Sequence, residues 1–259
     1  MLNGDSCITS EDSYILAANI ERLSAILSRS DNIVFFGGAG VSTESGIADF
    51  RSAGGLYDDT RNATYATPPE KMLSRSFFYD HTEEFYRYYK ERILHLDAAP
   101  NPAHIKLAEL ERSGRLRVVV TQNIDGLHQK AGTVNVIELH GSVFRNNCLD
   151  CGKQYDARYI AEADGVPVCG CGGVIKPDVV LYEESLDQGS IYRAINYIAD
   201  ADVLIIGGTS LAVYPAAGLV QNYRGDKLVV INKSETSSDD GALLVIRQGI
   251  GEVLGKVAV

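Results

Sequence analysis

The feature that most limits the possible folds is a series of apolar runs that each end in a short polar or glycine-rich loop. The first run, residues 33–36, leads directly into the turn at 37–40. Later runs end in TQNID (121–125), LHG (139–141), GGTS (207–210) and Asn232. In an open parallel sheet, ligands bind at the carboxyl ends of the strands. Polar residues at five strand ends therefore predict one ligand site at one edge of a sheet.

Segments with helical spacing of apolar residues flank these runs, at 13–30, 82–96, 103–114, 190–199 and 215–223. Strands that alternate with helices predict an α/β fold with a Rossmann-like parallel sheet and helices on both faces. Residues 144–176 are rich in cysteine and glycine and read as an inserted zinc ribbon. We expect a Rossmann-like domain from 1–51, 100–143 and 177–259, and a small zinc-ribbon and helical domain from 52–99 and 144–176.

Composition narrows the classes of partner. The 259 residues carry a formal net charge of −10, which disfavours a general nucleic-acid binder because such a protein needs a basic face. No apolar run approaches the ~18 residues of a membrane span. The first residues, MLNGDSCITSED, lack the basic and apolar regions of a secretory signal. We therefore expect a cytoplasmic protein without a membrane partner.

The glycine turn resembles a dinucleotide-binding loop but departs from the G-x-G-x-x-G fingerprint, because counting from Gly38 the third position falls on Thr43. A second glycine turn stands at 207–208. Backbone amides and nearby hydroxyls of both turns suit a pyrophosphate, although a sharp strand-to-helix turn explains either one equally well. The Asn232 side chain could form hydrogen bonds with ribose hydroxyls, or it could simply form a turn. The residues alone indicate a nucleotide-binding site.

Four of the five cysteines fall in two pairs, Cys148 with Cys151 and Cys169 with Cys171. The first pair and the gap are typical of a zinc ribbon, whereas the second pair is one residue shorter than C-x-x-C. Four thiolates leave no open coordination position, so the zinc is expected to be structural. A disulfide or a redox sensor is the alternative, and Cys7 is left over.

One histidine stands apart from the other four. His140 follows the apolar run VIEL and precedes Gly141, which places it at the predicted ligand edge. Imidazole titrates near neutral pH and can act as a general base there. His128, in GLHQ, is expected to pack or to form hydrogen bonds at a helix start.

Several longer motifs resemble those of the sirtuins, the NAD-dependent protein deacylases. They span about 35–233 in the family's order: GAGVSTESGIADFRS, TQNIDGLHQKAG, ELHGS, the four-cysteine module, KPDVVLYEE and GTSLAVYPAAGL. The resemblance implies removal of acetyl groups from protein lysines with NAD⁺ as co-substrate, yielding nicotinamide, O-acetyl-ADP-ribose and free lysine. It also implies one structural Zn²⁺ and an acetylated protein or peptide as partner, and we expect a monomer.

The resemblance assigns roles by position. It makes His140 the catalytic base, with Asn123 beside it, and Phe50 a shield against water. The implied cofactor-binding residues are Ala39, Ser42, Thr43, Asp49, Phe50, Arg51, Gln122, Ile124, Asp125, Thr209, Ser210, Asn232 and Ile250. The implied peptide-binding residues are Val179, Val180, Leu181 and Tyr182 on one edge and Leu211, Val213 and Tyr214 on the other. The peptide adds between them as a strand. Asp125 also suits the cap of a following helix.

The chain departs from the family at two further positions. Glu183 stands where many members have glycine. Desuccinylating sirtuins carry Tyr-x-x-Arg, whereas here Tyr86 is followed three residues later by Tyr89. We therefore expect acetyl or other uncharged acyl groups over succinyl. The alternatives are a mono-ADP-ribosyltransferase or longer-chain deacylase on this scaffold, and a zinc-ribbon adaptor or NAD-sensing regulator without turnover.

Overall fold

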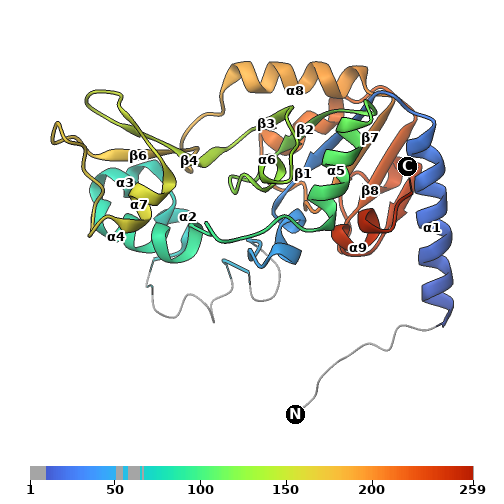
Figure 1. The fold of residues 1–259 in the computed structure, drawn as a ribbon, viewed down its shortest axis with the longest axis horizontal. Helices are drawn as coiled ribbons and strands as arrows, with labels where there is room; N and C mark the ends of the chain where they lie inside the picture. Colours follow the sequence, from blue (N-terminus) through green and yellow to red (C-terminus); the bar gives the residue numbers. More distant parts are fainter. Residues whose placement is uncertain (1–9, 51–54, 58–64, 66, 259) are drawn as a thin grey trace, which may run out of the picture.

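A six-stranded parallel sheet forms the centre of the computed structural model, which describes residues 10–50, 55–57, 65 and 67–258. The strands are β1 (Ile33–Gly37), β2 (Leu116–Thr121), β3 (Val136–Glu138), β7 (Val203–Gly207), β8 (Lys227–Ile231) and β9 (Leu244–Ile246). Their order is β3-β2-β1-β7-β8-β9 (Figure 1). All five neighbouring pairs are parallel. The predicted Rossmann-like sheet is confirmed.

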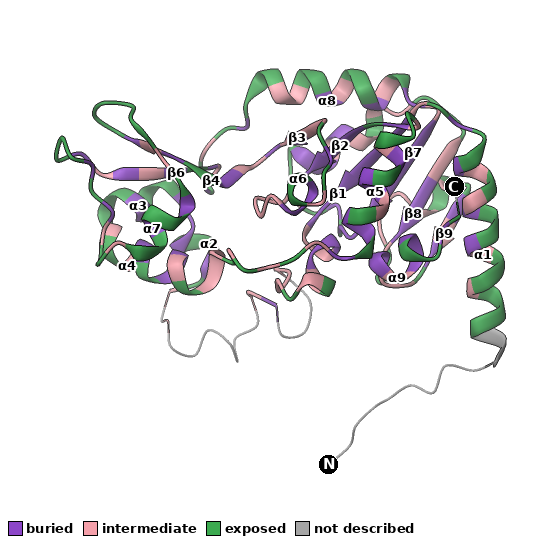
Figure 2. Ribbon diagram, in the orientation of Figure 1, coloured by how far each residue is buried: buried purple, intermediate pink, exposed green. Residues whose placement is uncertain are grey.

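Helices cover both faces of this sheet, because alternate residues of its buried strands point to opposite sides. Ile33 and Phe35 of β1 belong to one core cluster, and Val34 and Phe36 belong to the other. The first cluster lies under α1 (Ser10–Ser28), α5 (Pro102–Arg112) and α9 (Ile250–Gly255). The second lies under α8 (Gln188–Asp200) and the 3₁₀-helix η4 (Ala216–Asn222). Figure 2 shows the strands buried between these layers.

The strand order reverses its direction of winding at one point. From β1 the chain moves outward to β2 and β3 on one side, and it later fills the other side with β7, β8 and β9. The direction of winding therefore reverses between β1 and β7. In doubly wound sheets, the crevice for a dinucleotide lies at this switch point, outside the carboxyl ends of the strands.

A smaller unit lies beside the sheet, on the left of Figure 1. Its antiparallel strands, in the order β5-β4-β6, are β4 (Gly141–Cys148), β5 (Gln154–Tyr155) and β6 (Ile175–Val179). Its helices are α2 (Pro69–Met72), α3 (Arg75–Asp80), α4 (Thr82–Tyr88), the π-helix η3 (Tyr89–Ile93) and α7 (Ala157–Glu162). A third core cluster, rich in aromatic residues, joins these elements. The cluster supports the predicted two-part division, which we retain as a proposal.

Three local features differ from the sequence-based expectations. The helix expected over 82–96 is α-helical only to Tyr88 and continues as a π-helix to Ile93. The helix expected near 215–223 is a 3₁₀-helix, and it contains Gly218, a residue of low α-helix propensity. Helix α9 was not expected, because its six residues are too few for a periodic signal. Within the described residues, no helix combines the length and apolar character of a bilayer span.

Candidate active site

Two glycine turns touch where the central strands β1 and β7 end. The amide of Gly40 donates to the carbonyl oxygen of Gly208 at 2.8 Å, and the amide of Gly38 donates to that of Gly207 at 3.3 Å. A Cβ on Gly40 would lie 2.8 Å from the Gly208 oxygen. Gly208 also has a φ of +58°, which favours glycine. We expected these turns to offer their amides to a pyrophosphate, but the amides of Gly38 and Gly40 are engaged by the facing turn.

A buried hydroxyl links the first glycine loop to the loop after β2. The Ser42 hydroxyl donates to Asp125 Oδ2 at 2.6 Å, and the Asn123 side-chain amide donates to Ser42 Oγ at 3.0 Å. The other carboxylate oxygen of Asp125 accepts from the amide of Leu127 at 2.9 Å, at the start of α6 (Leu127–Lys130). Asp125 therefore supports the start of α6, as the helix-cap interpretation predicted. Its other oxygen joins it to the polar network of Ser42 and Asn123.

The orientation of His140 follows from a main-chain contact. Its Nδ1 lies 2.9 Å from the carbonyl oxygen of Gln122, which can only accept a hydrogen bond. Nδ1 is therefore protonated, and in the neutral ring Nε2 keeps its lone pair. The Gln122 side chain donates to Thr209 Oγ1 at 3.1 Å, so this loop is also tied to the second glycine turn. Gly141 has a φ of +77°, and a Cβ there would meet the Asp178 oxygen at 1.9 Å.

The surroundings of His140 favour its neutral form. Burial lowers the pKa of His140 from the ordinary value of 6.5, and the hydrogen bond to Gln122 opposes that effect only in part. A neutral imidazole with a free Nε2 at the crevice can accept a proton at neutral pH. This is the chemical property that a general base requires.

Asn101 is a structural residue of the site that the sequence analysis did not single out. It caps α5 by accepting from the Ala103 amide at 2.9 Å. Its side-chain amide donates to the Val41 carbonyl at 2.7 Å and to Ser45 Oγ at 3.1 Å. Asn101 thus holds the glycine loop against α5. The signal available in the sequence was the stretch Asn-Pro-x-His, a helix start that ends in His104.

The residues predicted for the adenosine end come after β7 and β8 and from the start of α9. The Asn232 side chain donates to the Ser234 carbonyl at 2.8 Å, as a turn-forming asparagine does. Ile250 is buried at the start of α9, and its Cδ1 fills the space beside Gly207 where a Cβ would lie. Ser210 is exposed.

The remaining predicted cofactor residues lie in the loops after β1 and β2, apart from Arg51, which is outside the described residues. Thr43 donates to the Gly40 carbonyl at 3.0 Å. The Phe50 and Tyr57 rings meet edge to face, with centroids 5.5 Å apart. Phe50 and Ile124 are half-buried and pack against the third core cluster. Ala39 and Asp49 are half-buried in the loop that joins these residues.

One predicted peptide edge is bonded to the helices of the small unit. The Tyr182 amide donates to the Leu73 carbonyl at 3.0 Å, and the Arg75 amide donates to the Tyr182 carbonyl at 2.9 Å. Glu183 has a φ of +73°, a conformation that costs a side chain about 1 kcal/mol or more. Its carboxylate accepts from the Ser76 amide at 2.8 Å and from the Ser76 hydroxyl at 2.9 Å. These bonds offset the backbone strain.

The predicted peptide residues differ in exposure. Three of them are buried (Val179, Leu181 and Leu211), and two are half-buried (Val180 and Val213). The side chains of Tyr182 and Tyr214 are exposed. The Val180 amide donates to the carbonyl oxygen of His140 at 3.0 Å. This edge is therefore one hydrogen bond away from the candidate base.

The four cysteines of the small unit converge on one point. Their sulfur atoms all lie within 4.8 Å of one another, with Cys148 to Cys171 at 3.5 Å and Cys151 to Cys169 at 3.6 Å. A zinc tetrahedron with Zn–S bonds of about 2.3 Å has sulfur–sulfur edges of about 3.8 Å. In a disulfide the two sulfur atoms lie about 2.05 Å apart, and none of these four cysteines forms one. The arrangement fits one zinc ion despite the short second pair. Cys7 lies outside the described residues.

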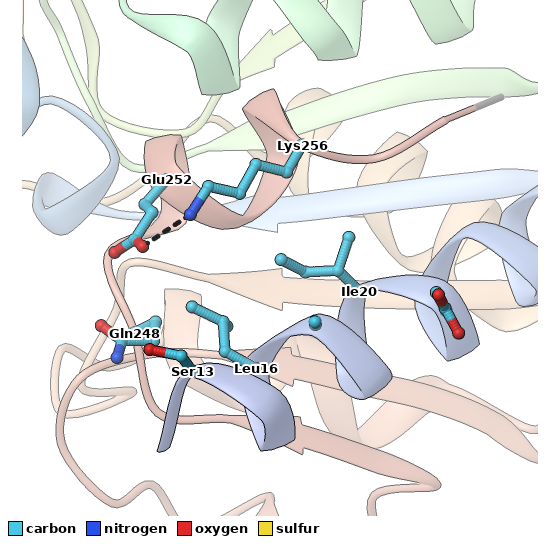
Figure 3. Close-up of a pocket in the computed structure, with 8 residues that line it drawn as sticks. Ser13, Leu16, Ile20, Gln248, Glu252 and Lys256 are labelled. Atoms are coloured by element: carbon cyan, nitrogen blue, oxygen red, sulfur yellow. Dashed lines mark hydrogen bonds and ion pairs between the residues drawn. The ribbon is translucent and has the colours of Figure 1, made fainter. Parts of the chain in front are cut away.

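A surface cleft of about 360 Å³ lies elsewhere, between α1 and α9 (Figure 3). Leu16 and Ile20 form its apolar floor, and the ion pair of Glu252 with Lys256, 2.9 Å apart, lies at its rim. None of the predicted cofactor, peptide or metal residues lines it.

Fold and site together define a dinucleotide-binding α/β protein with a four-thiolate zinc module. Residues 38–215 match the model of the Sir2 family. The chain is similar to an "NAD-dependent protein deacetylase" of Clostridium perfringens, with 59% identity over 92% of this chain and 98% of that one. It is also similar to two solved Sir2 complexes. One contains a p53 peptide and NAD⁺ (TM-score 0.80, 40% identity, 92% and 96% of the two chains covered).

The other complex contains deacetylated p53 peptide and 3'-O-acetyl ADP ribose, with a TM-score of 0.81, 40% identity, and 91% and 95% of the two chains covered. The match exceeds half of this chain, and the relatives are aligned over nearly their whole length. The chain belongs to the Sir2 family.

Proposed function

We propose that this protein is an NAD⁺-dependent protein-lysine deacetylase, which releases nicotinamide, O-acetyl-ADP-ribose and free lysine. The observation that carries the proposal is the placement of His140. Its Nδ1 is committed to the Gln122 carbonyl, 2.9 Å away, so its Nε2 remains a base at the switch-point crevice. The similarity to named deacetylases supports the same reaction.

The residues around the crevice fit a dinucleotide. NAD⁺ supplies a ribose carbon that becomes electrophilic as its bond to nicotinamide breaks. The network of Ser42, Asn123 and Asp125 offers amide and carboxylate groups to the polar carboxamide and ribose end. Thr209 and Ser210 offer hydroxyls to the diphosphate. Glycine is required at Gly38 and Gly40 because a Cβ at either position would meet the facing turn at Gly208 and Thr209.

His140 performs the proton transfer in this proposal. Its Nε2 accepts a proton from a ribose hydroxyl, and its Nδ1–H stays bonded to the Gln122 carbonyl. That carbonyl stabilises the imidazolium, so the ring keeps its orientation after it is protonated. Because burial lowers the pKa of His140, the base is already neutral at physiological pH.

Phe50 and the peptide edges exclude water and align the acyl group. An aromatic ring beside the glycine loop keeps bulk water from the reacting carbon. We place the acetyl-lysine peptide as a strand between the segments 179–182 and 211–214. The bond from the Val180 amide to the His140 carbonyl fixes the segment 179–182 relative to the base.

Zinc has a structural role here. Cys148, Cys151, Cys169 and Cys171 would hold it with four thiolates, which leaves no position for a substrate. The protein is proposed to act in the cytoplasm, where reducing conditions keep cysteines available for zinc.

The first experiment is mass spectrometry of an acetyl-lysine peptide incubated with the purified, zinc-loaded protein, with and without NAD⁺. We expect loss of one acetyl group only with NAD⁺, together with release of nicotinamide. His140→Ala removes the base and is expected to lower the rate by at least about 100-fold. The matched control is His95→Ala, which changes a histidine whose side chain bonds only locally, to the Arg92 carbonyl.

The outcomes separate the candidate functions. Transfer of label from NAD⁺ to protein without deacetylation favours a mono-ADP-ribosyltransferase. NAD⁺ binding without nicotinamide release favours a sensor. Equal activity of the His140→Ala and His95→Ala variants would exclude His140 as the base.

A further inference from the structure

The zinc module contains a polar contact that the four cysteines do not explain. The hydroxyl of Tyr155 lies 3.0 Å from the sulfur of Cys169. Tyr155 belongs to β5, which pairs with β4 through Asn146 and Asn147. It therefore reaches Cys169 from a different element than the turn that carries the cysteine.

The chemistry sets the direction of this contact. A zinc ligand is a thiolate, which has no proton and can only accept. A tyrosine hydroxyl can donate, so Tyr155 is the donor to Cys169 in the loaded site. Hydrogen bonds to charged acceptors are stronger than those to neutral ones.

The second cysteine pair has a particular need for such support. Only Gly170 separates Cys169 from Cys171. The turn after them is tight, because the Gly172 amide donates to the Cys169 carbonyl at 2.9 Å and the φ of Gly172 is +94°. A Cβ on Gly173 would lie 2.7 Å from the sulfur of Cys148. The backbone has little freedom to correct the position of the thiolates, so a side chain from outside the turn is well placed to hold one.

The Tyr155 ring is held independently of its hydroxyl. It packs on the Tyr159 ring with centroids 4.5 Å apart, and Lys153 Nζ lies 5.1 Å from its centre. Tyr159 in turn donates to the carbonyl of Val168, next to Cys169, at 2.8 Å. A phenylalanine at 155 would keep the ring in place and remove only the donor.

We propose that Tyr155 is a positioning residue of the zinc site, which donates a hydrogen bond to the Cys169 thiolate and thereby slows the loss of zinc. Partners that hold metal ligands in place commonly contribute about 10- to 100-fold to metal affinity. The proposal rests on zinc occupancy of the module and does not depend on the deacetylation reaction.

The test measures zinc transfer from the loaded, full-length protein to excess 4-(2-pyridylazo)resorcinol, together with zinc affinity by chelator competition. Tyr155→Phe is expected to weaken zinc binding by about 10- to 100-fold and to release zinc faster. Tyr192→Phe is the matched control, because Tyr192 lies on α8 and is 68% exposed. At saturating zinc, both variants should keep wild-type circular dichroism.

A second variant separates the hydroxyl from packing. Tyr155→Leu removes the ring as well as the donor. If Tyr155→Phe binds and releases zinc like the wild type while Tyr155→Leu does not, the ring alone matters and the proposal is wrong. Unchanged zinc binding in both variants would overturn it as well. Since the readout is zinc, a failure of the proposed deacetylase activity would leave this result unaffected.

Discussion

The Nδ1 of His140 and the main-chain oxygen of Gln122 lie 2.9 Å apart, and these residues follow different strands of the sheet. A backbone carbonyl cannot be removed by substitution and cannot donate a proton. It therefore fixes the tautomer of His140, and with it the nitrogen that keeps its lone pair.

The first prediction concerns pH. The lowered pKa of His140 means that the neutral base persists below the ordinary 6.5, so the acidic limb of kcat/KM is expected below that value. The measurement is a pH profile of kcat/KM for an acetyl-lysine peptide, with circular dichroism at each pH to separate unfolding. An acidic limb at or above 6.5 would contradict the assignment.

The second prediction concerns the Ser42 hydroxyl. Ser42→Ala removes both the donor to Asp125 and the acceptor for Asn123. Because a bond to a charged group contributes about 1.5–3 kcal/mol, we expect NAD⁺ affinity or kcat/KM to fall about 10- to 100-fold. Calorimetry with NAD⁺ and steady-state kinetics test this. Ser113→Ala, at the end of α5, is the control, and equal effects in the two variants would rule out the network.

The third prediction concerns Glu183. Glu183→Ala keeps the costly positive φ and removes both bonds to Ser76. The peptide edge should loosen, which raises the KM for peptide several-fold and changes kcat little. Glu235→Ala, an exposed change elsewhere, provides the comparison. A lower kcat at unchanged KM would place Glu183 in another role.

The fourth prediction concerns stability in acid. His104 and His128 are fully buried with ring centroids 4.7 Å apart, and burial lowers their pKa values to about 4 and about 3. Below 6.5 the unfolded chain binds protons that the folded protein does not. Stability is therefore expected to fall as pH falls from 6.5 toward 4, by up to about 1.4 kcal/mol per pH unit for each histidine.

Urea unfolding of the zinc-loaded protein across this range measures the slope. His128→Phe removes one of the two titrating groups, so the free energy of unfolding should depend less steeply on pH. The larger phenylalanine ring also changes the overall stability, which is why the slope is compared. An unaltered slope would mean that His128 is protonated in the folded state or that another group carries the effect.

The fifth prediction concerns the acyl group. Tyr86 and Tyr89 are fully buried in the aromatic cluster, and burial raises the pKa of both hydroxyls. Neither side chain offers a positive charge to an acidic acyl group. On matched peptides, deacetylation is expected to exceed desuccinylation by at least about 10-fold, since an unpaired carboxylate is costly to bury. Faster desuccinylation would refute this.

The sequence by itself determined the architecture and the chemical inventory. Buried apolar runs with polar ends predict a parallel sheet and its ligand edge from local periodicity alone. Cysteine spacing likewise indicated one metal site, and the motifs around His140 indicated the family. These features are local, so a linear pattern carries them.

Only the tertiary structure decided how those groups are used. Ser42 meets Asp125 across 83 positions of the chain, and Gln122 meets Thr209 across 87. The amides of Gly38 and Gly40 turned out to serve the facing turn, and Glu183 turned out to bond to Ser76. Hydrogen-bond partners far apart in the chain depend on how strands and loops pack, and no local sequence signal specifies that geometry.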